Sequence, residues 1–159
     1  MAVVDRYIDA NLADGQKQEA DIAGGAKALI LFPSFSVAAG DDNGSVYRIM
    51  RIESNARMFD IEIACTAITD GTDYDLGLYN VDLGPVVDAD LFMNAADFSS
   101  ASRSIDGMSA VAVADLNKPI WQLLGLSKDP MTQYDLAITA NVVGTVAGDI
   151  AVKILTAQN

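Results

Sequence analysis

The chain has 159 residues and a hydrophobic content of 51%, which suits one folded domain with its own core and excludes a disordered chain. Its net charge of −12 repels phosphate backbones and anionic lipid, so we expect no nucleic-acid partner and no membrane partner. The sequence has no histidine and a single cysteine, Cys65, which excludes an internal disulfide and the commonest general base and zinc ligand.

The first 26 residues differ in composition from the rest and end at Gly24-Gly25. We therefore assign residues 1–26 to an N-terminal arm and residues 27–159 to one β-domain. Apolar side chains near the start have the spacing of one short amphipathic helical turn. Two interpretations stay open: a frayed terminus, or an arm that docks on a neighbouring subunit. In the second, the docking side chains are Tyr7, Ile8 and Leu12.

Strand patterns begin at residue 28. Residues 28–37 contain Pro33, which lacks a ladder donor, so we place this strand at a sheet edge or at a bulge. Residues 45–52 carry apolar groups on both faces. Residues 57–68 alternate most clearly, and this alternation predicts Phe59 and Cys65 inward, with Cys65 as a buried core thiol, and Met58 outward.

The spacing of apolar residues differs among the later segments. Residues 73–80 alternate again, with Tyr74, Leu76 and Leu78 predicted inward. Residues 86–98 carry apolar side chains three or four positions apart, which predicts a short helix over one end of the sheet. Residues 119–126 could form a strand or a short helix.

The chain closes with two strands, at residues 134–139 and 149–155. Strands about ten residues apart with turns between them are typical of sandwiches and barrels. The predicted fold is a mainly antiparallel β-sandwich, jelly-roll-like, with one short helix and an N-terminal arm.

Acidic residues offer two candidate sites, each with a simpler interpretation. Asp70, Asp73 and Asp75 could hold Ca²⁺, but their spacing does not match the EF-hand loop, and a turn followed by outward acids explains them. The pairs Asp60/Glu62 and Asp88/Asp90 could perform glycoside hydrolysis, but no aromatic cleft pattern accompanies them. We therefore expect no catalytic residue, no metal ion and no cofactor.

Three of the ten basic residues, Arg48, Arg51 and Arg57, fall within ten positions. Strict alternation places Arg48 and Arg51 on opposite faces. The arginines either pair with nearby acids or reach a carboxylate of a neighbouring subunit. Trp121, beside several leucines, is either a core residue or an interface anchor.

One stretch, residues 45–91, resembles a family of small bacteriophage virion proteins found among head-associated structural or decoration (cement) proteins. The segments that carry the resemblance are Ser45-Val46-Tyr47-Arg48, Ser54-Asn55-Ala56-Arg57, Gly71-Thr72-Asp73-Tyr74-Asp75-Leu76-Gly77-Leu78-Tyr79 and Val86-Val87-Asp88-Ala89-Asp90-Leu91. They cover about a third of the chain. Residues 1–26 and 105–130 match poorly.

The resemblance implies an assembly role without catalysis. It implies a protein made in the host cytoplasm that binds the major capsid protein on the outer capsid surface as a homo-oligomer, with a trimer favoured, and stabilises the head. Alternatives are a tail, neck or head-fibre component, or a module that binds host glycans. An enzyme is the least favoured class, for want of histidine and of any catalytic motif.

Overall fold

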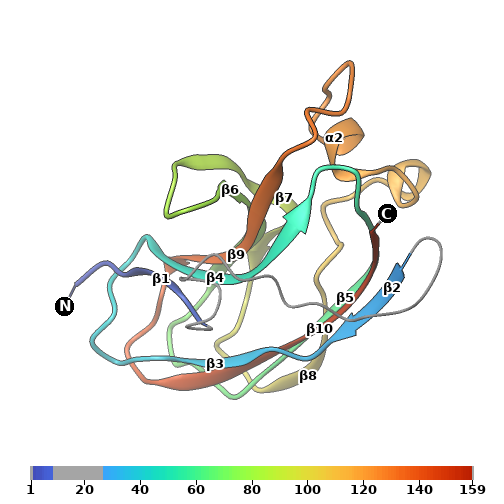
Figure 1. Ribbon diagram of the computed structural model, residues 1–159. Coiled ribbons are helices and arrows are strands. Elements are labelled where there is room, and N and C mark those ends of the chain that lie inside the picture. The colour runs from blue at the N-terminus through green and yellow to red at the C-terminus, as the bar shows by residue number, and fades with distance from the viewer. Residues whose placement is uncertain (1, 9–26, 159) are drawn as a thin grey trace.

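The computed structural model describes residues 2–8 and 27–158, which form two packed β-sheets (Figure 1). The first sheet has the order β1-β4-β9-β6-β7, and the second has the order β2-β10-β5-β8, with β3 also paired to β10. The strands of the first sheet are β1 (Asp5–Tyr7), β4 (Ser45–Glu53), β9 (Gln133–Val142), β6 (Asp73–Asn80) and β7 (Val86–Ala96). Those of the second are β2 (Lys27–Leu31), β3 (Ser34–Val37), β10 (Gly148–Gln158), β5 (Arg57–Cys65) and β8 (Ser102–Asp106).

Strand pairing is antiparallel except between β1 and β4, which run parallel. The predicted mainly antiparallel β-sandwich is therefore confirmed. In the described part of the chain, helical structure is limited to a 3-10 turn, η1 (Val113–Asp115), and one α-helical turn, α2 (Ile120–Leu123). None of the described helices has the length and hydropathy needed to cross a membrane.

The core lies between the sheets and is built from the predicted inward positions. Tyr74, Leu76 and Leu78 of β6 are fully buried, and Cys65 is buried as predicted. Burial raises the pKa of the Cys65 thiol, so it behaves as a small apolar side chain. The closing strands add the buried side chains Leu136, Ile138, Ile150, Val152 and Ile154.

Pro33 divides the first long strand, as its missing donor predicts. β2 and β3 both pair with β10, and the ladder is interrupted between them. The Pro33 carbonyl still accepts a hydrogen bond from the Val152 N–H at 2.8 Å. The β2–β3 segment forms one edge of the second sheet, which confirms the edge position.

The predicted helix at residues 86–98 is wrong: this segment forms β7. Its pairing with β6 shifts register three times, and Ala95 has a positive φ of 52°. These irregularities break the two-residue alternation and leave apolar residues at helix-like spacing. Gly77 of β6 allows a close approach, because a Cβ there would lie 2.0 Å from the Asp88 carbonyl oxygen. The one short α-helix is instead α2.

The predicted orientation of two β5 side chains is also wrong. A register shift opposite Leu155 and Thr156 turns Met58 into the core and leaves Phe59 49% exposed. A bulge inserts one extra residue, so side chains beyond it change faces.

The start of the chain forms a strand and not the predicted helical turn. β1 pairs with β4, and Ala2 forms an isolated bridge with Asp41. Ile8 is half-buried and packs against the core. Leu12 and the rest of the predicted arm, residues 9–26, lie outside the described residues.

Candidate functional site

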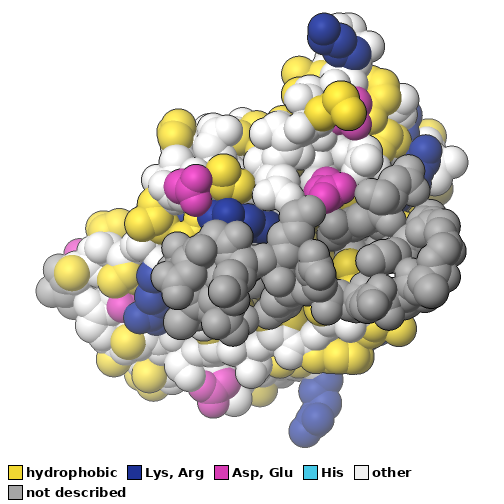
Figure 2. Space-filling view, in the orientation of Figure 1, with side chains coloured by type: hydrophobic (Ala, Val, Ile, Leu, Met, Phe, Trp, Pro, Cys, Tyr) yellow, Lys and Arg dark blue, Asp and Glu magenta, His cyan; other side chains and the backbone are white. Residues whose placement is uncertain are grey.

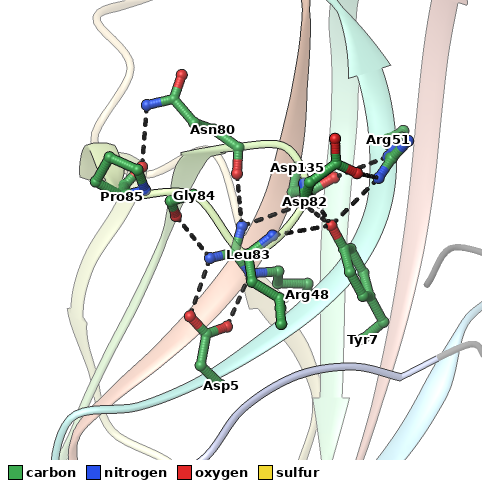
Figure 3. A network of polar contacts seen from close by, with 10 residues as sticks. All are labelled: Asp5, Tyr7, Arg48, Arg51, Asn80, Asp82, Leu83, Gly84, Pro85 and Asp135. Carbon is green, nitrogen blue, oxygen red and sulfur yellow. Dashed lines mark hydrogen bonds and ion pairs between the residues drawn. The ribbon is translucent and has the colours of Figure 1, made fainter. Parts of the chain in front are cut away.

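A buried ion cluster joins β1 to the body of the protein (Figure 3). We use this name for Asp5, Tyr7, Arg48, Arg51, Asp82 and Asp135. Arg48 and Asp135 stand on the neighbouring strands β4 and β9, and both side chains are completely buried. A buried charge is costly unless it is paired, so the cluster must be satisfied internally.

All five N–H donors of Arg48 are used within the chain. Its Nε and one Nη2 hydrogen donate to the two carboxylate oxygens of Asp5, at 2.8 and 3.0 Å. One Nη1 hydrogen donates to Asp135 at 3.1 Å. The remaining two donate to the carbonyl oxygens of Asn80 and Gly84, at 2.7 and 2.8 Å. Arg48 therefore connects β1, β4, β9 and the turn between β6 and β7.

Tyr7 and Arg51 complete the cluster. The Tyr7 hydroxyl donates to Asp135 at 2.6 Å and accepts the Asp82 N–H at 2.9 Å. Arg51 forms ion pairs with Asp82, at 2.7 Å, and with Asp135, at 3.4 Å. β1 is thus anchored by side-chain contacts as well as by its three-residue ladder.

The charges of the cluster stabilise each other. Burial alone lowers the pKa of Arg48, but hydrogen bonds to Asp5 and Asp135 and their negative charges raise it above its ordinary value. The guanidinium therefore stays charged. This arrangement can hold a strand in place, and Arg48 has no exposed surface with which to contact another molecule.

The structure brings Tyr7, Arg48 and Arg51 together, although alternation placed the two arginines on opposite faces. That expectation is wrong because the β4–β9 register shifts between Arg48 and Met50, which returns Arg51 to the side of Arg48. Sequence reasoning missed Asp5 and Asp135. Asp135 sits in the otherwise apolar run from Tyr134 to Ile138, and an acid in such a run signals a buried cation partner.

Arg57 and Trp121 lie together at another end of the sandwich. Arg57 is exposed, donates to the Asn117 carbonyl and forms an isolated bridge with Pro119. Trp121 is half-buried in α2, and its backbone N–H donates to the Ser54 carbonyl oxygen at 2.9 Å. We call residues 113–131 the α2 projection, which protrudes from the body (Figures 1 and 2). Its exposed apolar side chains are Val113, Leu116, Leu126 and Met131.

The acidic candidates have partners within the chain. Asp73 and Asp75 both accept hydrogen bonds from the Asn141 amide, at 3.1 and 2.6 Å. Asp60 and Glu62 both pair with Lys153. No group of three or more acidic or cysteine ligands occurs in the described residues. These contacts agree with structural roles for the acids.

Asp88 and Asp90 remain as a close carboxylate pair on β7. Desolvation, followed by the hydrogen bond with Asp90, raises the pKa of Asp88. Asp90 also accepts a hydrogen bond from Asn94 at 2.5 Å. The pair lies on the edge strand of the first sheet.

No protein-family model matches this chain, and no curated protein matches it in sequence. Among solved structures, a chain from the capsid of Ralstonia phage GP4 matches with a TM-score of 0.61 at 14% identity, over 97% of this chain and 99% of that chain. A chain from the capsid asymmetric unit of cyanophage Pam1 matches with a TM-score of 0.48 at 10% identity, over 91% and 96% of the two chains. The Ralstonia phage likeness shows a shared fold, and its coverage shows that the two chains have nearly the same length.

Proposed function

We propose that this chain is a structural protein of a bacteriophage virion that binds the outer capsid surface and stabilises the head. The observation that carries the proposal is the fold shared, over nearly the whole of both chains, with a chain from the Ralstonia phage GP4 capsid. The resemblance of residues 45–91 to head-associated decoration proteins supports the same role. An assembly protein needs no catalytic residue, so the absence of histidine is compatible with it.

The mechanism is multivalent attachment. Copies bind the major capsid protein, and we favour three copies per unit at the local symmetry axes of the shell. Each contact can be weak, because many simultaneous contacts on a repeating lattice give avidity. A bound unit that spans several capsid subunits then resists their separation.

The α2 projection is the surface we assign to the capsid contact. Met131 is 90% exposed, and apolar side chains exposed together in this way mark interaction sites. Arg57 and Trp121 stand at its base, and both residue types are frequent interface anchors. We therefore expect Arg57→Ala and Met131→Asp to weaken capsid binding.

The test uses undecorated shells of the virus that carries this chain. Saturable binding of the wild-type protein, with shells that survive heating better, would support the proposal. Val146→Asp, an exposed position in the β9–β10 connection, is the matched control for Met131→Asp. Absence of wild-type binding, or a dozen or fewer copies per virion, would reject the capsid role; the low copy number would indicate a tail or neck component.

A further inference from the structure

The outer face of the second sheet has an apolar half. Ile30 and Phe32 on the β2 edge are 61% and 71% exposed, and Phe59 on β5 is half exposed. Leu155 of β10 is the direct cross-strand partner of Ile30 and stands opposite Asp60, next to Phe59. The bulge in β5 therefore places Phe59 on the same patch as Ile30 and Leu155. We call these four residues the apolar ridge.

The other half of the same face is hollow. A depression of about 460 Å³ opens there. Its floor is formed by the short side chains Ala64 of β5 and Ala151 of β10, and Ser34, Ala101, Arg103 and Asp149 stand around it. In the described chain, the sheet thus carries bulky apolar groups at one end and a recess at the other. β2, β10, β5 and β8 lie side by side in the layer concerned (Figure 1).

Lys153 marks the midpoint between the two halves. Leu155, Lys153 and Ala151 occupy alternate outward positions of β10, so ridge and hollow are separated by roughly 13 Å along the strand. Lys153 pairs with Asp60 at 3.3 Å and with Glu62 at 3.4 Å. Glu62 is the direct cross-strand partner of Lys153 and holds the equivalent middle position on β5.

We propose that this face binds the same face of a second copy of the chain, in a contact separate from any that joins three copies on the capsid. The two-fold axis lies in the interface, between the second sheet of one copy and the second sheet of the other. It is perpendicular to the strands and passes near Lys153. Rotation about it reverses the direction of β10, so the apolar ridge of each copy enters the hollow of the other. Lys153 lies at the axis and faces Lys153 of the other copy, with Glu62 of both copies on the neighbouring strands, and the interface is self-complementary.

The exposed apolar ridge supplies part of the area that a two-fold contact needs. At about 200 Å² for a large apolar side chain, the exposed fractions of Ile30, Phe32 and Phe59 amount to roughly 360 Å². A stable interface needs about 800 Å² from each partner. The ridge of each copy therefore supplies a little under half of that copy's share, and the hollow and the strands around it would supply the rest.

Charge also favours a second copy. The chain carries −12 overall, and two copies repel each other at most surfaces. On this face the charges nearly cancel, with carboxylates at Asp60, Glu62, Asp106 and Asp149 and cations at Arg57, Arg103 and Lys153. Two copies can therefore approach through this face without strong repulsion.

The symmetry is tested by disulfide formation with single cysteines. Only a residue near a two-fold axis meets its own copy, so Lys153→Cys should form a disulfide-linked dimer under mild oxidation. Ala151→Cys and Leu155→Cys should each stay largely unlinked alone and become linked when mixed. Wild-type protein controls for the buried Cys65, and Val146→Cys controls for random collision of exposed thiols. Linking of Lys153→Cys no faster than of Val146→Cys would overturn the proposal.

The energetics are tested by sedimentation equilibrium. The wild-type mass should be twice that of the Phe32→Glu/Phe59→Glu variant, whose self-association should be weaker on the order of 100-fold. Both positions are exposed, so unchanged thermal melting will show that the variant folds. Met131→Glu, at a still more exposed apolar position on the α2 projection, should associate like wild type. Equal masses for wild type and the double variant would refute the interface, and this result is independent of capsid binding.

Discussion

Replacing Asp135 with alanine tests whether the buried ion cluster stabilises the fold. The substitution removes the partner of two arginines and the acceptor of the Tyr7 hydroxyl. Arg48 would keep its contacts with Asp5 and with two carbonyl oxygens, but it would hold an excess positive charge in a site closed to water. Destabilisation is therefore expected from the unpaired charge more than from the lost side-chain volume.

The expected loss is about 3 kcal/mol in the free energy of unfolding. Removing one partner of a buried ion pair typically costs about 3–5 kcal/mol. The side chains of Arg48 and Asp135 are both fully buried, so solvent does not screen their attraction. Asp5 still neutralises Arg48 in part, which places the loss at the lower end of this range.

Urea unfolding followed by circular dichroism measures the effect. With a slope of about 2 kcal/mol per molar urea, the midpoint should fall by roughly 1.5 M. Asp5→Ala is the graded control: its carboxylate is partly exposed, so water can replace it and we expect a loss of about 1.5 kcal/mol. Arg48→Met/Asp135→Leu removes both charges and should recover at least half of the loss. A loss below about 1 kcal/mol for Asp135→Ala would refute the buried-charge argument.

Two further substitutions test the β6–β7 region. Because the pKa of Asp88 is raised in the folded state, its protonated form contributes stability at low pH that is lost as the pH rises through the raised value. Asp88→Asn should therefore raise the melting temperature at pH 7 and leave it nearly unchanged at pH 3. An equal gain at both pH values would contradict a raised pKa of Asp88 in the folded protein. Gly77→Ala would place a Cβ 2.0 Å from the Asp88 carbonyl oxygen, so the free energy of unfolding should fall by about 3 kcal/mol. A fully stable Gly77→Ala protein in urea titration would show that β7 can move away from β6.

Alternation predicted the sandwich because most strands keep a strict two-residue period. The inward side chains of β6, β9 and β10 follow from the sequence alone, and so does the interruption at Pro33. These positions are fixed by local chemistry: apolar residues face the core, and proline lacks a donor.

The wrong predictions about side-chain orientation and about β7 share one physical cause. Register shifts in β4, in β5 and between β6 and β7 each move later side chains to the other face, and the sequence carries no clear sign of them. They turned Phe59 outward, brought Arg51 beside Arg48 and made β7 resemble a helix. The ion cluster was missed for another reason: Asp5 and Asp135 are 130 positions apart, and only the fold brings them together.

The division of the second sheet's edge at Pro33 limits how copies of this protein can associate. An uninterrupted edge strand is a template for open-ended strand addition, which leads to fibrils. Here Pro33 offers no N–H to Val152, so the ladder to β10 is interrupted and the edge is presented as two short strands, β2 and β3. At high protein concentration, an edge made of two short strands is a poorer template for strand addition and disfavours fibril growth.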